Sequence, residues 1–187
     1  MNRALLNFCA FQIGWFTCVL GAANGMPWLS LVVFPIVFWS VRKSDSASSE
    51  LLLIVLAVVL GLVLDSLLVN SGWLSYPSGV FIEGIAPYWI LALWALFATT
   101  LNVSMSWLKR NLVLAMAMGA VFGPLSYMAG QRFGAIEIVN FDASMIALSI
   151  GWAVAMPLML TAAIWLDGGP KQAVDVQLVI NTGAKDA

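Results

Sequence analysis

The chain lacks histidine altogether and carries little charge, and both scarcities narrow what it can do. Without histidine it has neither the commonest metal ligand nor the usual general base that titrates near neutral pH. Its two cysteines, Cys9 and Cys18, lie nine residues apart in one apolar stretch, where a helix would turn them to opposite faces. We therefore expect neither a disulfide nor a shared metal site within one chain. Only 9% of the 187 residues are charged, against about 25% in soluble domains.

Motifs of established chemistry are also lacking. The sequence contains no glycine-rich phosphate loop, no nucleophile elbow and no large basic block of the kind that binds nucleic acid. The acidic residues Glu83, Glu137 and Asp142 do not have the spacing of metal ligands. The sequence therefore favours a protein that is not an enzyme, has no cofactor and does not bind nucleic acid. Its carboxylates leave enzyme activity as the weaker alternative.

What the chain has in abundance is apolar sequence, with 62% hydrophobic residues and a mean hydropathy of +0.97. Apolar runs of roughly 17–25 residues are long enough to cross a bilayer, and inside the hydrocarbon they must be helical to satisfy their backbone groups. We therefore predict an all-α, polytopic membrane helix bundle with six transmembrane helices in residues 1–167, followed by a cytoplasmic tail, 168–187. The predicted spans are 4–22, 27–41, 51–69, 85–107, 112–128 and 144–166.

The basic residues predict the topology. When the gaps between spans are numbered alternately, seven of the eight Lys and Arg residues fall on one side, and only Arg132 falls on the other. This asymmetry places both termini in the cytoplasm. The run 27–41 is the weakest span, since Pro35 interrupts it, and a re-entrant half-helix is the alternative. Omitting it would move Arg42 and Lys43 outside, which argues against that alternative.

Asp65 is the strongest candidate for a functional residue, because it lies inside the predicted span 51–69 near its external end. A carboxylate at mid-membrane costs about 2.5–3.5 kcal/mol, so it is expected to face the bundle interior and find a partner. Gly61, one turn earlier on the same face, would let another helix approach closely. Two interpretations stay open: a ligand or proton site that opens outward, or an ion pair with Arg132 that fastens the bundle.

The fifth predicted span carries the second signal. Gly119 and Gly123 form a GxxxG pattern for close helix contact, and Pro124 predicts a kink. A broken helix near Tyr127 and Arg132 is the type of element that builds transporter sites, although a plain packing kink is the favoured interpretation.

Other polar and aromatic residues inside the spans have structural explanations by default. Gln12 lies midway along the first span, where an interhelical hydrogen bond is the default explanation. Deep tryptophans such as Trp94 and Trp152 need partners for their indole N–H groups. The external segments 70–84 and 129–143 are too aromatic for solvated linkers, and we expect them to fold over the outer end of the bundle.

A resemblance to a known family is carried by Phe11–Phe16, Asp65, Pro87–Trp89 with Leu93–Trp94 and Phe97–Leu101, and Gly123–Gly130. They resemble a family of small bacterial inner-membrane proteins known only as a domain of unknown function, and the resemblance implies a bacterial inner (plasma) membrane for this protein. The resemblance implies no activity, although an association with genes of fatty-acid modification would imply a lipid-linked role. The architecture is more loosely similar to the substrate-capture subunits of energy-coupling-factor transporters, whose first helix contacts a partner subunit through small residues. Here Gly14 and Gly21 would share that face.

We expect a binding or transport component for a small molecule or lipid, with an outward-facing site formed by Asp65, Tyr127, Arg132 and Gln12. The alternative is a structural or accessory membrane protein without its own ligand. The expected partners are the lipid bilayer, a small-molecule or lipid ligand, and a second membrane protein. An enclosed polar pocket reaching Asp65 would favour binding, whereas a packed bundle with Asp65 neutralised by Arg132 would favour the accessory function.

Overall fold

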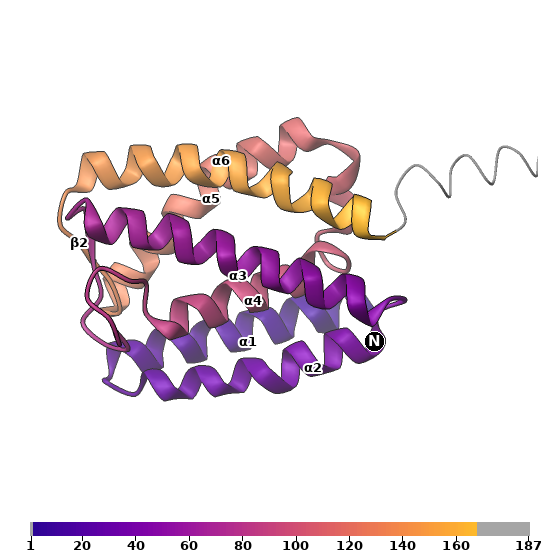
Figure 1. The fold of residues 1–187 in the computed structure, drawn as a ribbon, viewed down its shortest axis with the longest axis horizontal. Helices are drawn as coiled ribbons and strands as arrows, with labels where there is room; N and C mark the ends of the chain where they lie inside the picture. Colours follow the sequence, from indigo (N-terminus) through magenta and orange to yellow (C-terminus); the bar gives the residue numbers. More distant parts are fainter. Residues whose placement is uncertain (1, 168–187) are drawn as a thin grey trace, which may run out of the picture.

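The structure, a computed structural model, describes residues 2–167, and the predicted tail 168–187 lies outside the described residues. The expected all-α bundle is confirmed, and its helices run side by side along the long axis of the molecule (Figure 1). The elements are α1 (Arg3–Ala23), η1 (Pro27–Val32), α2 (Val33–Lys43), α3 (Ala47–Asn70), β1 (Leu74–Ser75), α4 (Tyr88–Leu101), η2 (Ser106–Arg110), α5 (Leu112–Phe133), β2 (Glu137–Ile138) and α6 (Phe141–Leu166), where η marks a 3-10 helix.

Four of the described helices, α1, α3, α5 and α6, are long and apolar enough to cross a membrane. The other two are shorter than the spans expected from the sequence. The run 27–41 begins as the 3-10 helix η1 and becomes α-helical at Val33, with Pro35 in the first turn, where its missing N–H costs no helical hydrogen bond. The prediction of a helix over 85–107 was too long: α4 begins at Tyr88 and ends at Leu101.

The chain reverses at two ends of the bundle, which we name by their contents. The strand end holds the connections 24–26, 71–87 and 134–140, where β1 pairs antiparallel with β2, Leu74 opposite Ile138. The Ser78 hydroxyl there donates to the Ala22 carbonyl at 2.8 Å. The terminal end holds the first residues of α1, the connections 44–46 and 102–111, and Asp167. The strand end is therefore a folded cap, as expected of 70–84, whereas 129–133 belongs to α5, which continues past Pro124 to Phe133.

Two packing arrangements position the site. Helix α4 is the central helix, with nine buried residues among its fourteen, and contacts α1, α2, α3 and α6. Helix α5 packs chiefly on α6. A Cβ at Gly119 or Gly123 would overlap Trp152 of α6, so the expected close helix contact at this GxxxG pattern is confirmed. Because α5 packs on α6 rather than on α4, a space remains between α5 on one side and α1 and α4 on the other.

Candidate functional site

Asp65 lies at the junction of three helices and is fully buried. Its Oδ1 accepts hydrogen bonds from the hydroxyls of Tyr76, at 2.7 Å, and Tyr127, at 2.6 Å. Its Oδ2 accepts a hydrogen bond from Nε1 of Trp94 at 2.8 Å. One carboxylate on α3 thus ties together α4, α5 and the loop that follows β1.

The local sequence explains how Trp94 reaches the carboxylate. Gly61 lies one turn before Asp65 on α3, and a Cβ there would overlap the Trp94 indole. The absence of a side chain at Gly61 therefore lets the ring lie directly against α3, as expected for a close approach. The Trp94 ring also stacks on Trp152 of α6, with centroids 4.7 Å apart and planes 11° apart.

The surroundings of Asp65 are neutral. Its oxygens face two tyrosine hydroxyls and one indole N–H, all of them uncharged groups that can donate a hydrogen bond. Burial first, and the Asp65 charge second, raise the pKa of the loop residue Tyr76 well above its usual value, so its hydroxyl remains a donor. Arg132 is exposed in the last turn of α5, and the ion pair that the described residues form is Lys109–Asp167. The Asp65–Arg132 ion pair considered from the sequence is not formed.

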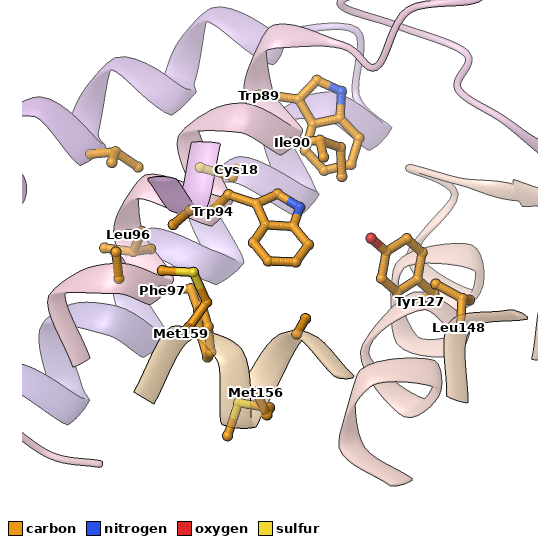
Figure 2. Close-up of a cluster of buried hydrophobic side chains, with 14 of the residues drawn as sticks. Cys18, Trp89, Ile90, Trp94, Leu96, Phe97, Tyr127, Leu148, Met156 and Met159 are labelled. Atoms are coloured by element: carbon orange, nitrogen blue, oxygen red, sulfur yellow. The ribbon is translucent and has the colours of Figure 1, made fainter. Parts of the chain in front are cut away.

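A pocket of about 500 Å³ lies between α1, α4 and α5, with Trp152 and Met156 of α6 behind it. Its walls are mainly apolar and aromatic, and none of the described residues that line it carries a charge. Gln12, Ser126 and Tyr127 supply its side-chain amide and hydroxyl groups. Figure 2 shows Trp94 and Tyr127 facing one another, with the Tyr127 hydroxyl directed toward the indole. Asp65 itself does not line the pocket and lies behind these two side chains.

A second, smaller pocket of about 220 Å³ lies between α3 and α6. Trp94, Tyr127 and Trp152 line both pockets, so these three side chains form a partition between them. Asp65 holds two of the three members of this partition by hydrogen bonds. Asp65 therefore holds Trp94 and Tyr127, two of the side chains that line the larger pocket, in position.

The structure brings together some of the residues expected at the site. Asp65 and Tyr127 are hydrogen-bonded, and Gln12 lines the same pocket as Tyr127, whereas Arg132 lines neither pocket. Sequence reasoning did not identify Tyr76 as a partner of Asp65 and treated Trp94 as a packing residue. The signal for Trp94 was present, because a tryptophan deep in a span needs an acceptor for its indole N–H.

The pocket is apolar and carries few polar groups. In residues 2–167 no group of three or more histidine, cysteine or acidic side chains could hold a metal ion. An apolar cavity with a few hydrogen-bonding groups is typical of a site for an apolar or amphipathic molecule.

Four described helices of spanning length and apolar composition, packed around a buried polar cluster, are consistent with an α-helical membrane protein. The chain belongs to the family described as "Protein of unknown function (DUF2878)", whose sequence model matches residues 4–158. This match confirms the resemblance seen in the sequence. No curated protein and no solved structure matches the chain. Gly14 and Gly21, compared above with partner-contacting residues of transporter subunits, pack against Leu96 and Leu29 of this chain itself.

Proposed function

We propose that this protein is an integral inner-membrane protein that binds a molecule from the bilayer in the pocket between α1, α4 and α5. The observation that carries the proposal is the pocket itself, about 500 Å³ in volume. Ligand sites range over about 300–1,000 Å³, and this pocket falls within that range. A pocket of this size with apolar and aromatic walls therefore supports binding.

The proposed topology has six crossings and cytoplasmic termini. Successive α-helices are connected alternately at the terminal end and the strand end, which supports the even number of crossings. Arg3, Arg42, Lys43, Lys109 and Arg110 lie at the terminal end, whereas Arg132 lies at the strand end. The positive-inside rule then assigns the terminal end to the cytoplasm of a bacterial cell. A membrane-impermeant maleimide added to intact cells is expected to label Glu83→Cys and not Arg110→Cys, and the reverse pattern would contradict this topology.

The two short helices fit this topology together with their neighbours. Helix α4 has fourteen residues and covers about 21 Å of a hydrocarbon core of about 30 Å. The turn 102–105 and η2 continue from its end toward Lys109 and Arg110. In the same way, η1 and α2 follow one another without a break from Pro27 to Lys43.

The site residues take different roles in this proposal. Tyr127 and Gln12 line the pocket and are proposed to contact the ligand. Asp65 is a positioning residue, because it acts through the Tyr127 and Trp94 side chains that it holds. Arg132 is exposed outside the pocket, and we leave it out of the proposed binding surface.

One observation favours the accessory alternative. Every hydrogen bond to Asp65 comes from within this chain, so the described structure satisfies the carboxylate without a ligand. In that alternative the polar cluster only assembles helices, and the pocket is a space that bulk lipid fills without preference.

Filling the pocket separates the two functions. Ala129 of α5 lines the pocket, and Ala117 of the same helix is exposed outside it, so Ala129→Phe and Ala117→Phe make a matched pair. Native mass spectrometry of the gently extracted protein is expected to show a defined co-purified molecule in the wild type and in Ala117→Phe, and its loss in Ala129→Phe. A wild-type protein without a defined adduct, or an adduct that survives in Ala129→Phe, would contradict binding in this pocket.

A further inference from the structure

We infer that the pocket selects an uncharged single-chain lipid whose one hydrogen-bonding group, a hydroxyl or a carbonyl, is bound by the side-chain amide of Gln12. The inference rests on the proposed function, since it concerns the same pocket, and it names the class of ligand. It follows from three observations: the lack of charge in the walls, the hydrogen bonds already donated by the Ser126 and Tyr127 hydroxyls, and the depth of Gln12.

The walls offer no counter-charge. None of the described residues that line the pocket is charged. Asp65 does not line it, and is hydrogen-bonded to the far side of its wall through Tyr127 and Trp94. An ionised group in such an apolar environment would lose its hydration and gain no ion pair, which is strongly unfavourable. The pocket therefore disfavours charged ligand groups.

The hydroxyl hydrogens of the pocket are already donated to other groups of the protein. Three lining side chains can both donate and accept: Gln12, Ser126 and Tyr127. The Ser126 hydroxyl donates to the Gly123 carbonyl at 2.7 Å, and the Tyr127 hydroxyl donates to Asp65 at 2.6 Å. Within residues 2–167, the side chain of Gln12 makes no hydrogen bond to another residue of the protein. Its amide has donors and an acceptor available for one neutral polar group of a ligand.

The depth of Gln12 limits the shape of the ligand. Gln12 is the tenth of the 21 residues of α1, about 14 Å along the helix from its start. A group bound there lies near the middle of the membrane, whereas the charged headgroup of a phospholipid stays at the interface. Phe11 and Trp15 on α1, with Phe97 and Trp89 on α4, supply apolar walls along which a hydrocarbon chain can lie.

Three probes of equal chain length test this specificity: hexadecane, hexadecanol and hexadecyl sulfate. The full-length protein is reconstituted in nanodiscs, and binding is followed by the fluorescence of its tryptophans, with affinities expressed per mole fraction of probe in the bilayer. Hexadecanol is expected to bind about three- to tenfold more tightly than hexadecane, the effect of one net hydrogen bond. Hexadecyl sulfate is expected to bind more weakly than both.

A pair of variants on α1 assigns the preference to Gln12. Gln12→Leu is expected to bind hexadecane as the wild type does and to lose the preference for hexadecanol. Thr17→Val is the matched control, because Thr17 lies on the same helix outside the pocket and bonds only the Ile13 carbonyl of its own helix. It should keep the preference.

The outcomes of these measurements distinguish a failure of the proposed ligand class from a failure of the proposed binding function. Equal affinities for hexadecane and hexadecanol, tightest binding of hexadecyl sulfate, or an undiminished preference in Gln12→Leu would each overturn the inference while leaving an apolar site in place. If none of the three probes binds, or if Ala129→Phe binds all of them as well as the wild type does, the proposed function fails with it.

Discussion

Helix α3 carries a buried carboxylate near each of its ends, and the two carboxylates are held in different ways. Asp65 accepts hydrogen bonds only from the aromatic side chains Tyr76, Trp94 and Tyr127. Glu50, about 22 Å away along the helix, accepts from Ser40 and Asn102, each at 2.9 Å.

The two surroundings differ in their access to charge and water. Asn102, which donates to Glu50, accepts a hydrogen bond from Lys109 at 2.6 Å, and Lys109 also bonds Asp167 at 2.6 Å. The Asp167 side chain is 46% exposed, so this network reaches from the buried Glu50 to the surface. No cation takes part in the hydrogen bonds to Asp65 among the described residues. Glu50 can therefore be rehydrated when a partner is lost, whereas Asp65 and its donors cannot.

The comparison also shows what each carboxylate organises. Glu50 joins the ends of helices through small polar side chains that touch neither pocket. Asp65 holds Trp94 and Tyr127, which are walls of both pockets. A change at Asp65 should therefore alter both stability and binding, and a change at Glu50 should alter stability alone.

Removal of either carboxylate is expected to lower the free energy of unfolding, and removal of Asp65 should lower it most of all the changes considered. Asp65→Ala leaves the Trp94 indole and two tyrosine hydroxyls buried without an acceptor, and should lower the free energy of unfolding by about 3–5 kcal/mol. Glu50→Ala should cost about 1–3 kcal/mol, because water at the terminal end can reach its former partners. Titration with sodium dodecyl sulfate in mixed micelles measures both values.

An exposed residue of the same helix serves as the control for the two carboxylate variants. Val63→Ala changes an exposed side chain on the same helix and should stay well below both carboxylate variants. Equal losses for Asp65→Ala and Glu50→Ala would show that the two sites are equally accessible to water, against the difference drawn here.

The close approach at Gly61 can be tested with a second glycine. Gly61→Ala places a methyl group where the Trp94 indole lies, and should destabilise the protein by about 1–3 kcal/mol by overpacking. Gly151→Ala on α6 meets only Leu64, at an ordinary 3.8 Å, and should stabilise its helix by up to about 1 kcal/mol. The same titration measures both variants. A neutral Gly61→Ala would mean that Trp94 does not need its position against α3.

The sequence predicted part of this site for sound physical reasons. A carboxylate inside an apolar run must face inward and find partners, and Gly61 one turn away marks a close helix contact, so Asp65 and its surroundings could be located. The choice of Arg132 as partner assumed that only a cation could satisfy a carboxylate. In the structure neutral donors do so, and which aromatic residues supply them depends on how α4, α5 and the loop after β1 pack.

Other features depend on arrangements that a linear pattern does not show. Glu50 follows a run of serines and directly precedes the predicted span 51–69, a pattern typical of a polar linker, yet α2 and the turn after α4 bury it. Apolar residues continue to Trp107, but α4 ends at Leu101. The pocket exists because α5 packs on α6 and stands away from α4, so neither condition set from the sequence was met: the pocket is apolar, and Asp65 is bonded to neutral groups.

The smallest expected effect comes from the exposed end of the Glu50 network. The Lys109 and Asp167 side chains are 19% and 46% exposed, and an ion pair this open to solvent contributes at most about 1 kcal/mol. Asp167→Asn should therefore lower the free energy of unfolding by less than about 1 kcal/mol, and the difference from the wild type should shrink as salt is added. The same detergent titration at low and high salt measures it, with Arg110→Gln as a control for loss of charge at this end. A loss in Asp167→Asn as large as that in Glu50→Ala would mean that Lys109 supports the buried Glu50 only while Asp167 holds it in place, and the terminal end would then be as intolerant of change as the site around Asp65.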